Sequence, residues 1–298
     1  MNTHPLFDTF FQGQALDMLL QGIDLALEED GPDLTSEAVF SPEEILQATV
    51  VAKAPGIITG LPFIGLILEG AGPAGHEAEI DLLVDEGSRV VSGQEICHLR
   101  GSATLLLKAE RVILNYLTHL SGIATLTDSF VRALSGSHTQ LLDTRKTLPG
   151  LRYPEKYAVR IGGGQNHRLN LAQMLMLKDN HIDQAGSITS AVTKLQSKYH
   201  PCPPIEVECR TRDHVQEAVA AGVERIMLDN MNQEDITDCL TFIPEGIESE
   251  ISGGVTLENL TRLGALGADF ISVGCLTNSA PILDLSMKLR LDPDSSGL

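Results

Sequence analysis

Between residues 140 and 274 the chain repeats one pattern, in which a short run of β-forming residues precedes a stretch with helical periodicity. The helical stretches are clearest over residues 211–221, 232–240 and 256–266. The candidate strands are Gln140–Asp143, Ala172–Lys178, Ile205–Glu208, Arg225–Asp229, Glu248–Ser252 and Phe270–Gly274. Strands that alternate with helices are typical of parallel sheets. This region therefore predicts a TIM-like, incomplete parallel α/β barrel.

The candidate strands end in polar or small residues. These residues are Asp143, Lys178, Glu208, Asp229, Ser252 and Gly274. Barrel enzymes carry their chemistry at the carboxyl ends of the strands. Because the ionic side chains at these ends are of both signs, the pattern predicts a catalytic rim.

Positive charge is concentrated in one part of an acidic chain. Residues 143–181 contain seven Lys or Arg and two His against three acidic residues, whereas the whole chain has 21 Lys plus Arg, 40 Asp plus Glu and a net charge of −19. Such a concentration indicates an anionic ligand. A nucleic acid is disfavoured, because the net charge repels a polyanion and the basic residues do not recur along a stripe with aromatic stacking residues. We therefore expect a small polyanion bound in a pocket.

The first part of the chain has a different organisation. Residues 5–25 have helical periodicity, and the polar residues 28–37 predict a loop. Residues 46–101 contain short β-type runs broken by Gly and Pro, which predict a small mixed sheet with turns at Asp85–Ser88 and Ser92–Gly93. The interpretation of Lys53 as the modified lysine of a carrier module is disfavoured, because no hairpin turn residues surround it.

Residues 103–134 predict a long helical stretch with a break at Ser121–Gly122. We place a domain boundary near its start. Residues 1–110 would form an N-terminal domain. Residues 111–298 would form the catalytic barrel, with the option that the C-terminal tail returns to the first domain.

Composition also predicts the compartment. The five cysteines are scattered without a Cys-x-x-Cys pair, which indicates reduced thiols and no zinc site. No apolar run reaches the roughly 18 residues that a membrane span needs, and the N-terminus lacks signal-peptide features. Lys53 is the single basic side chain in residues 1–60, which argues against mitochondrial import. We therefore expect a cytoplasmic enzyme without membrane partners.

A set of short motifs connects the chain to a known family. The motifs are Glu110-Arg111 with Asn115, Leu120–Thr125, Asp143–Thr147 with Pro149-Gly150, Glu155–Arg160, Gly162–Gly164, Asn166–Arg168, Lys178–His181, Glu206–Glu208, Leu228–Asn230, Ser252–Gly254 and Ser272–Gly274. In order and spacing they resemble the type II phosphoribosyltransferases, specifically the quinolinate phosphoribosyltransferase family, over residues 105 to 288. The resemblance implies a pentosyltransferase that converts quinolinate and phosphoribosyl pyrophosphate to nicotinate mononucleotide, pyrophosphate and CO₂ in NAD biosynthesis.

The resemblance also implies roles for single residues. Arg145 and Arg168 would hold the two carboxylates of quinolinate, and Lys146 would lie near the pyrophosphate. The segments that would bind the 5′-phosphate are Ser252, Gly253 and Gly254 together with Val273, Gly274 and Cys275. The resemblance makes residues 1–110 an N-terminal α/β sandwich domain that serves as a scaffold and dimerisation domain. Arg111 would reach the active site of the other subunit, which implies a homodimer or a higher oligomer. Relatives often have a His in the segment that here carries Asn278, so the charge of that contact would be lost.

The residues themselves support several of these roles and leave others open. Thr144, Arg145 and Lys146 follow a strand end, where Arg suits a carboxylate and Lys a phosphate, although a solvated loop is also possible. The glycine triplet at residues 162–164 would let the backbone bend close to a ligand and so bring His167 and Arg168 to it. A lone His, however, is more often a structural hydrogen-bonding residue than a ligand contact.

Lys178 could be catalytic. Alternatively, its ammonium group could reach solvent while its aliphatic stem lies along the apolar strand before it. His181 could be a simple loop residue. Glu208 and Asp229 could bind Mg²⁺ or ribose hydroxyls, or they could form structural ion pairs. We expect Lys146, Lys178, Glu208 and Asp229 to be catalytic. We also expect Mg²⁺ to accompany the substrate diphosphate and no organic cofactor to be needed.

Two other functions stay open. Lys178 could form a Schiff base, as in class I aldolases. The chain could also be a non-catalytic sensor of anionic ligands, or a molybdenum-transport-associated paralogue of the same family.

Overall fold

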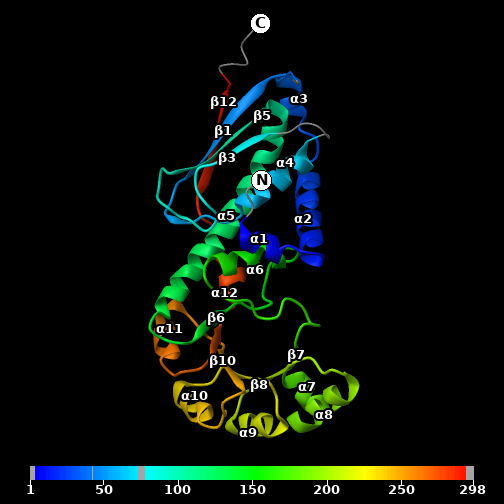
Figure 1. The fold of residues 1–298 in the computed structure, drawn as a ribbon, viewed down its shortest axis with the longest axis vertical. Coiled ribbons are helices and arrows are strands. Elements are labelled where there is room, and N and C mark those ends of the chain that lie inside the picture. Colours follow the sequence, from blue (N-terminus) through cyan, green and yellow to red (C-terminus); the bar gives the residue numbers. More distant parts are fainter. Residues whose placement is uncertain (1–3, 42, 73–77, 293–298) are drawn as a thin grey trace. The chain divides into compact units, whose positions relative to one another are not determined.

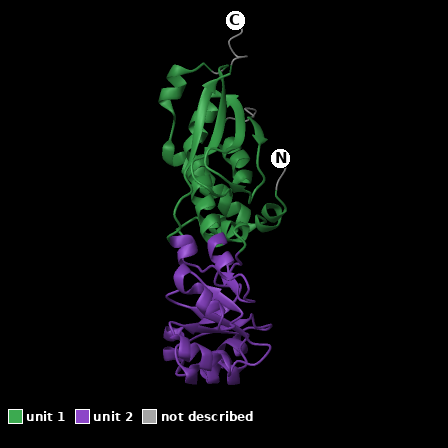
Figure 2. Cartoon of the chain, turned by 90° about the vertical axis from the view of Figure 1, so that its left-hand side faces the viewer, with its two compact units in different colours: residues 1–127, 147–163, 279–298 green, residues 128–146, 164–278 purple. Residues whose placement is uncertain are grey.

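The structure is a computed structural model that describes residues 4–41, 43–72 and 78–292. The chain divides into two compact units (Figure 2): unit 1 comprises residues 1–127, 147–163 and 279–298, and unit 2 comprises residues 128–146 and 164–278. The expected boundary at residue 110 falls inside helix α5 (Ala103–Ala133), which belongs to unit 1 as far as Thr127.

Unit 1 is built on a four-stranded antiparallel sheet with the strand order β12-β1-β5-β3 (Figure 1). A second antiparallel pair joins β2 to β4. The strands are β1 (Ile45–Ala52), β2 (Gly56–Ile57), β3 (Glu79–Leu82), β4 (Arg89–Val90), β5 (Glu95–Ser102) and β12 (Leu285–Leu291). The prediction of a mixed sheet was wrong, because every pairing among these strands is antiparallel. Strand β12 returns from the far end of the sequence and pairs with β1 from Leu46↔Leu291 to Ala52↔Leu285.

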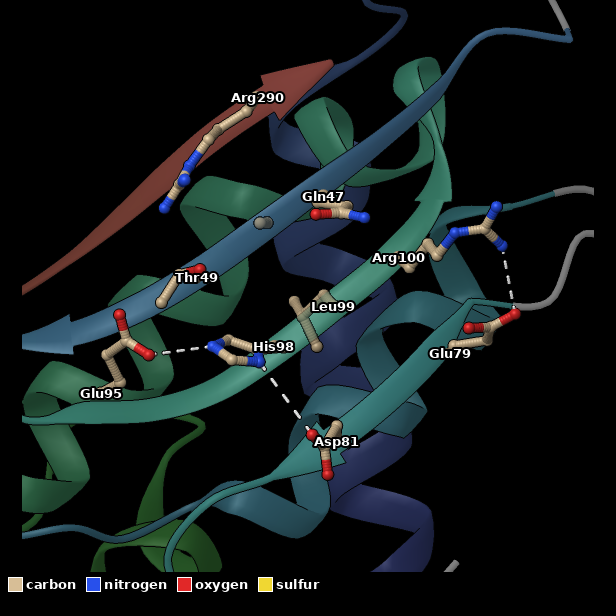
Figure 3. A pocket seen from close by; sticks show the side chains of 10 residues that line it. Gln47, Thr49, Glu79, Asp81, Glu95, His98, Leu99, Arg100 and Arg290 are labelled. Atoms are coloured by element: carbon tan, nitrogen blue, oxygen red, sulfur yellow. Dashed lines mark hydrogen bonds and ion pairs between the residues drawn. The ribbon is translucent and has the colours of Figure 1, made fainter. Parts of the chain in front are cut away.

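One face of this sheet is apolar and the other is polar. Ala48 and Val50 of β1 are buried, whereas the intervening Gln47 and Thr49 line a hollow on the opposite face (Figure 3). The helices assigned to this unit, besides the first part of α5, are α1 (Pro5–Phe10), α2 (Gln14–Asp30), α3 (Leu34–Val39), α4 (Leu61–Ala71) and α6 (Arg152–Ile161). The buried core residues Leu19, Ile64 and Leu106 come from α2, α4 and α5.

Two predictions in unit 1 were wrong for identifiable reasons. The expected loop at residues 28–37 is largely helical, because α2 continues to Asp30 and Asp33 caps α3 by accepting a hydrogen bond from the Ser36 N–H at 3.0 Å. The expected break at Ser121–Gly122 is absent from the continuous α5. Gly122 instead allows the backbone of Pro281 to approach, because a Cβ atom there would clash with it. Ser121 accepts a hydrogen bond from the Thr59 N–H at 2.9 Å.

Unit 2 is a six-stranded parallel sheet with the order β6-β11-β10-β9-β8-β7, in which β6 and β7 form the two edges (Figure 1). The strands are β6 (Gln140–Leu142), β7 (Leu175–Leu177), β8 (Ile205–Cys209), β9 (Arg225–Asp229), β10 (Glu248–Ser252) and β11 (Phe270–Ser272). All of the six candidate strands are thereby confirmed, and β9 and β10 have the predicted bounds. Because β6 and β7 do not pair with each other, the sheet is the incomplete α/β barrel that the sequence predicts.

Helices follow these strands in the manner of a barrel. They are α7 (Asp179–Ala185), α8 (Ile188–Lys198), α9 (Arg212–Ala221), α10 (Gln233–Leu240), α11 (Leu257–Gly264) and α12 (Cys275–Asn278). Side-chain oxygens of Thr211, Asn232 and Thr256 cap α9, α10 and α11, so the short loops before these helices are set by sequence. Among the described residues, every helix is too short or too polar to cross a bilayer.

Candidate active site

A pocket of about 280 Å³ lies in unit 2, at the carboxyl ends of the parallel strands. The predicted site residues that line it are Thr144, Arg145, Lys146, His167, Arg168, Lys178, Glu208, Asp229 and Ser252. The sequence did not single out four further lining residues, which are Met176, Met227, Glu250 and Ser272. The pocket thus gathers cations from the basic segment opposite the carboxylates of β8 and β9.

Strand alternation explains why these side chains meet. Successive residues of a strand face opposite sides, so Glu206 and Glu208 of β8 point the same way, as do Met227 and Asp229 of β9. The parallel register sets Glu208 beside Met227 and Ser252 beside Asp229. One side of the sheet therefore carries polar side chains from neighbouring strands, and those at the carboxyl ends of the strands line the pocket.

The rim of the pocket holds a network of ion pairs. Lys178 Nζ lies 2.8 Å from Glu208 Oε2, and Arg210 Nη2 lies 3.3 Å from Glu208 Oε1. Arg210 also reaches Asp179 at 3.0 Å and Asp229 at 3.9 Å. The structural ion pair between Lys178 and Glu208, which the sequence left open, therefore exists in this structure. Sequence reasoning missed Arg210, although it follows a strand end as Arg145 does.

Asp143, which follows β6, fixes the segment that contains Asn166 and His167. Its carboxylate is fully buried and accepts hydrogen bonds from Asn166 Nδ2 at 2.6 Å and from the His167 N–H at 2.9 Å. The next residue, Arg168, donates from Nη1 to the Met174 carbonyl at 2.9 Å. Burial lowers the pKa of Arg168, and the nearby Arg145 adds to this effect. Two cations in such proximity favour an anionic ligand between them.

The loop after β6 orients Arg145 and Lys146. Thr144 Oγ1 accepts from the Lys146 N–H at 3.0 Å, and Thr277 Oγ1 donates to the Lys146 carbonyl at 2.7 Å. Among the described residues, no hydrogen-bond partner reaches the buried Nε of Arg145. A buried guanidinium nitrogen without a protein partner indicates a ligand contact at this position.

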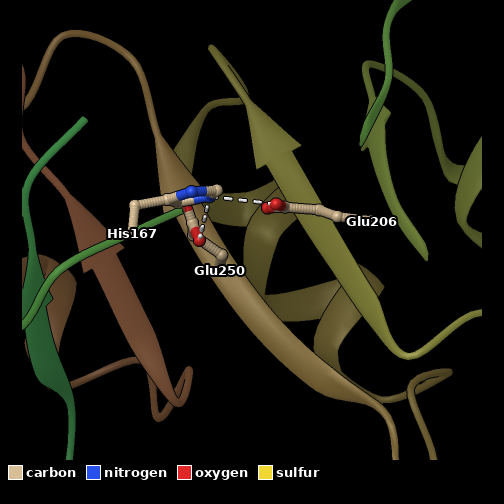
Figure 4. Close-up of side chains that lie close together, drawn as sticks. All are labelled: His167, Glu206 and Glu250. Carbon is tan, nitrogen blue, oxygen red and sulfur yellow. Dashed lines mark ion pairs between the residues drawn. The ribbon is translucent and has the colours of Figure 1, made fainter. Parts of the chain in front are cut away.

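A buried cluster of three side chains lies at the pocket, formed by His167, Glu206 of β8 and Glu250 of β10 (Figure 4). His167 Nε2 lies 2.9 Å from Glu206 Oε2 and 3.6 Å from Glu250 Oε2. Burial raises the pKa of each glutamate to about 7. The sequence analysis named neither glutamate as a site residue. The only signal was a charged residue in the middle of each predicted strand, two positions before the polar end.

The predicted phosphate-binding segments lie next to this pocket but contribute little to its lining. Of their residues, Ser252 lines it, whereas Gly253, Gly254, Val273, Gly274 and Cys275 do not. Gly253 has a φ of +92° and leaves no room for a Cβ atom beside Asn230. At Gly274 a Cβ atom would lie 3.0 Å from Cδ of Lys146, so this glycine makes space for that side chain.

Three other sequence expectations have a place in the structure. Arg111 is exposed on α5 in unit 1 and is not among the residues that line the pocket. His181 accepts a hydrogen bond from the Lys178 N–H at 3.0 Å through Nδ1, and so helps to cap α7. Asn278 is the exposed last residue of α12.

Comparison with known families agrees with this architecture. Residues 33–121 match the sequence model described as quinolinate phosphoribosyl transferase, N-terminal domain, and residues 123–288 match the model of its C-terminal domain. The chain belongs to the quinolinate phosphoribosyltransferase family.

Individual relatives support the same membership. The chain is 42% identical over 270 residues to a probable nicotinate-nucleotide pyrophosphorylase (carboxylating) of Bacillus subtilis, covering 90% of this chain and 92% of the relative. It is 36% identical to the human nicotinate-nucleotide pyrophosphorylase (carboxylating), covering 90% of each chain. The solved structure of NadC from Streptococcus pyogenes superimposes with a TM-score of 0.87 at 37% identity, covering 94% of this chain and 99% of that one. The expected fold, an N-terminal domain joined to an α/β barrel, is thus also that of the family.

Proposed function

We propose that the chain catalyses the carboxylating nicotinate-nucleotide pyrophosphorylase reaction. Quinolinate and phosphoribosyl pyrophosphate would give nicotinate mononucleotide, pyrophosphate and CO₂, a step of NAD biosynthesis. The names of the relatives support this reaction. The observation that carries the proposal is the pocket itself, which brings Arg145, Arg168 and Lys178 together with the carboxylates of Glu208 and Asp229.

The two arginines are suited to a planar dianion. A guanidinium forms paired hydrogen bonds with a carboxylate, and the proximity of Arg145 to Arg168 matches the two neighbouring carboxylates of quinolinate. Lys146 lies beside the small residue Gly274, which leaves space for an oxyanion of the diphosphate near its ammonium group. In this arrangement the protein supplies mainly positioning and charge stabilisation.

The reaction needs two changes of bonding. The lone pair of the pyridine nitrogen forms a bond to C1 of the ribose while the bond from C1 to the pyrophosphate oxygen breaks, and pyrophosphate leaves with that electron pair. The positive ribose ring of this step is stabilised by carboxylates such as Glu208 and Asp229. In the second change, the carbon–carbon bond to the 2-carboxylate breaks, CO₂ leaves, and a proton from solvent neutralises the ring carbanion, which the cationic ring nitrogen stabilises.

A magnesium ion bound to the diphosphate fits the donor set. Glu208 and Asp229 offer hard carboxylate oxygens, the ligand type that Mg²⁺ prefers. Both oxygens of Glu208 are already engaged by Lys178 and Arg210, so the contact to a hydrated, substrate-bound ion would fall more readily to Asp229. When bound, Mg²⁺ would neutralise charge on the leaving pyrophosphate.

The Schiff-base alternative is less well supported. An activated lysine is desolvated or held near another cation. The side chain of Lys178 is 47% exposed and is paired with Glu208 at 2.8 Å. Borohydride trapping with a carbonyl substrate would label Lys178 if this alternative held, and we expect no label.

The assembly and compartment belong to the same proposal. We propose a cytoplasmic homodimer, or a higher oligomer, in which the exposed Arg111 of each subunit serves the active site of its partner. Mixing an Arg111→Ala variant with a Lys178→Ala variant should restore part of the activity, because a shared site would be complete in a fraction of the mixed dimers. Two variants that stay inactive after subunit exchange would contradict the shared site.

A pyrophosphate-release assay tests the function directly. Quinolinate, nicotinate and nicotinamide are offered separately beside phosphoribosyl pyrophosphate and Mg²⁺, and release with quinolinate alone is expected. Binding of quinolinate without release would favour the sensor or the molybdenum-transport-associated paralogue.

Arg145→Ala tests the residue that carries most of the carboxylate binding. The loss of a charged pair should lower kcat/KM for quinolinate by roughly 100-fold or more, about 3 kcal/mol. Arg212→Ala is the control, because Arg212 is half-exposed and does not line the pocket. Near-normal turnover of Arg145→Ala would remove Arg145 from the site.

A further inference from the structure

Both ring nitrogens of His167 lie close to other protein groups. Nδ1 accepts a hydrogen bond from the Arg168 N–H at 2.7 Å, so Nε2 must carry the proton of the neutral ring. Nε2 lies 2.9 Å from Glu206 Oε2 and 3.6 Å from Glu250 Oε2, at ion-pair distance from both. The ring therefore accepts from the neighbouring backbone, while its protonated nitrogen faces the buried carboxyl groups.

This arrangement fixes the backbone that carries Arg168. Asp143 holds the backbone of His167 through its N–H at 2.9 Å, and the ring of His167 holds the next N–H along the chain. The guanidinium of Arg168 is then fastened to the Met174 carbonyl. The position of Arg168 in the pocket thus depends on the orientation of the His167 ring.

The burial of the cluster is unusual for side chains that only fill space. His167 is 5% exposed, and Glu206 and Glu250 are 0% exposed. Burying carboxyl groups is costly, and apolar side chains of similar volume would pack a barrel interior at least as well. Arg225 lies 3.4 Å from Glu250 and its charge also acts on Glu206, yet burial still raises the pKa of both glutamates. Polar groups retained at such cost are best explained by the orientation that they give to His167.

The same three side chains could in principle hold a metal ion, because one ligand atom from each lies within 4.8 Å of the others. Two observations favour a proton instead. Nδ1 of His167 accepts from the Arg168 N–H, so the proton of the neutral ring lies on Nε2, the nitrogen that faces Glu206 and would have to bind the ion. Glu250 is also faced by the cation of Arg225, which would oppose a divalent ion.

We propose that Glu206 and Glu250 are positioning residues that hold His167 in its Nε2–H form and, through that ring, set Arg168 to bind a carboxylate of the pyridine substrate. The substrate part of this inference rests on the proposed function. The hydrogen-bond part does not, so the two can fail separately.

Steady-state kinetics of two Glu206 variants test the positioning role. Glu206→Leu removes the acceptor and should raise KM for quinolinate about tenfold, with KM for phosphoribosyl pyrophosphate changed less than about twofold. Glu206→Gln should recover most of the loss, because an amide oxygen still accepts from Nε2–H. Glu248→Gln, on β10, is the control for replacing a strand glutamate outside the cluster, since Glu248 is half-exposed and pairs with Arg225. Equal changes in both KM values, or no recovery with Gln, would overturn the proposal.

A spectroscopic measurement keeps the test valid if Glu206→Leu does not fold. The ¹⁵N resonances of His167, assigned by comparison with His167→Gln, report the tautomer in the unmodified protein, and the Nε2–H form is expected. An Nδ1–H ring or a charged ring would overturn the proposal. So would a stoichiometric metal found by elemental analysis of the purified protein, which would assign the cluster to metal binding.

Discussion

In the described residues, a histidine lies between two carboxylates both in unit 1 and in unit 2, and these two clusters differ in burial. In unit 1, His98 lies 3.0 Å from Glu95 and 4.0 Å from Asp81, and these side chains are 46%, 51% and 74% exposed (Figure 3). In unit 2, His167 lies at similar distances from Glu206 and Glu250, and none of the three is more than 5% exposed (Figure 4). The same residue types therefore occur on a polar sheet face and inside a barrel.

The comparison indicates which charged groups are informative about a binding site. On the sheet face, water solvates each group, and such pairs contribute about 0–1 kcal/mol. One cation there also has local partners, since Arg100 pairs with Glu79 at 3.2 Å and with Asp292 at 2.6 Å. In the barrel, buried polar groups have little access to water, and within the part of the chain that the structure describes the Nε of Arg145 has no hydrogen-bond partner. A buried polar atom without a protein partner, rather than a count of charges, identifies the binding site.

The largest expected effect comes from removing the buried histidine. His167→Ala should lower the free energy of unfolding by roughly 3 kcal/mol, because two buried carboxyl groups lose their donor and a cavity forms. Urea denaturation of the purified protein measures this change. A loss below about 1 kcal/mol would mean that the barrel cluster is as solvated as the one on the sheet face, and the comparison would fail.

A second effect concerns pH. Burial raises the pKa of Glu250 to about 7 in the folded protein from an ordinary value of 4.5. A raised pKa favours the protonated folded form, so this contribution to stability is complete below about pH 4.5 and is lost as the pH rises through 7. The difference in unfolding free energy between the unmodified protein and Glu250→Gln should thus change by on the order of 2 kcal/mol between pH 5 and pH 8. Parallel pH profiles of the two proteins would show that Glu250 does not titrate in this way.

The smallest effect is expected on the exposed sheet face. His98→Ala should change the free energy of unfolding by less than about 0.5 kcal/mol, because water replaces the contacts to Glu95 and Asp81. The pyrophosphate-release rate should stay unchanged, since none of these residues lines the barrel pocket. A destabilisation comparable to that of His167→Ala would show that burial is not the deciding variable.

The barrel was predictable from sequence because its strands and their polar ends repeat locally. Asp143, Lys178 and Glu208 stand at or just beyond the strand ends in the structure, as the alternation predicts. The sheet of unit 1 was predicted less well, because β12 joins it from a distant part of the sequence. Helix α4 went unrecognised, since its apolar residues have no polar face to reveal a period and it lies almost wholly in the core.

The site was predicted best where a long charged side chain follows a strand. Glu206 and Glu250 were not predicted as site residues, because a single acidic residue inside a strand does not reveal which side chains face it. The contact of these glutamates with His167 depends on three segments that are separate in the sequence, and only the folded arrangement of the strands brings them together. The capping role of His181 was hidden for a simpler reason, because loop and cap residues have similar local sequences.

The pairing of β12 with β1 sets an order of events during synthesis. β12 follows every strand of the six-stranded sheet in the sequence, so β1 has an open edge until this late segment has been made. An exposed strand edge is a template for unwanted pairing with other chains. Until β12 pairs with it, β1 is therefore a place where the newly made first sheet can associate with other chains.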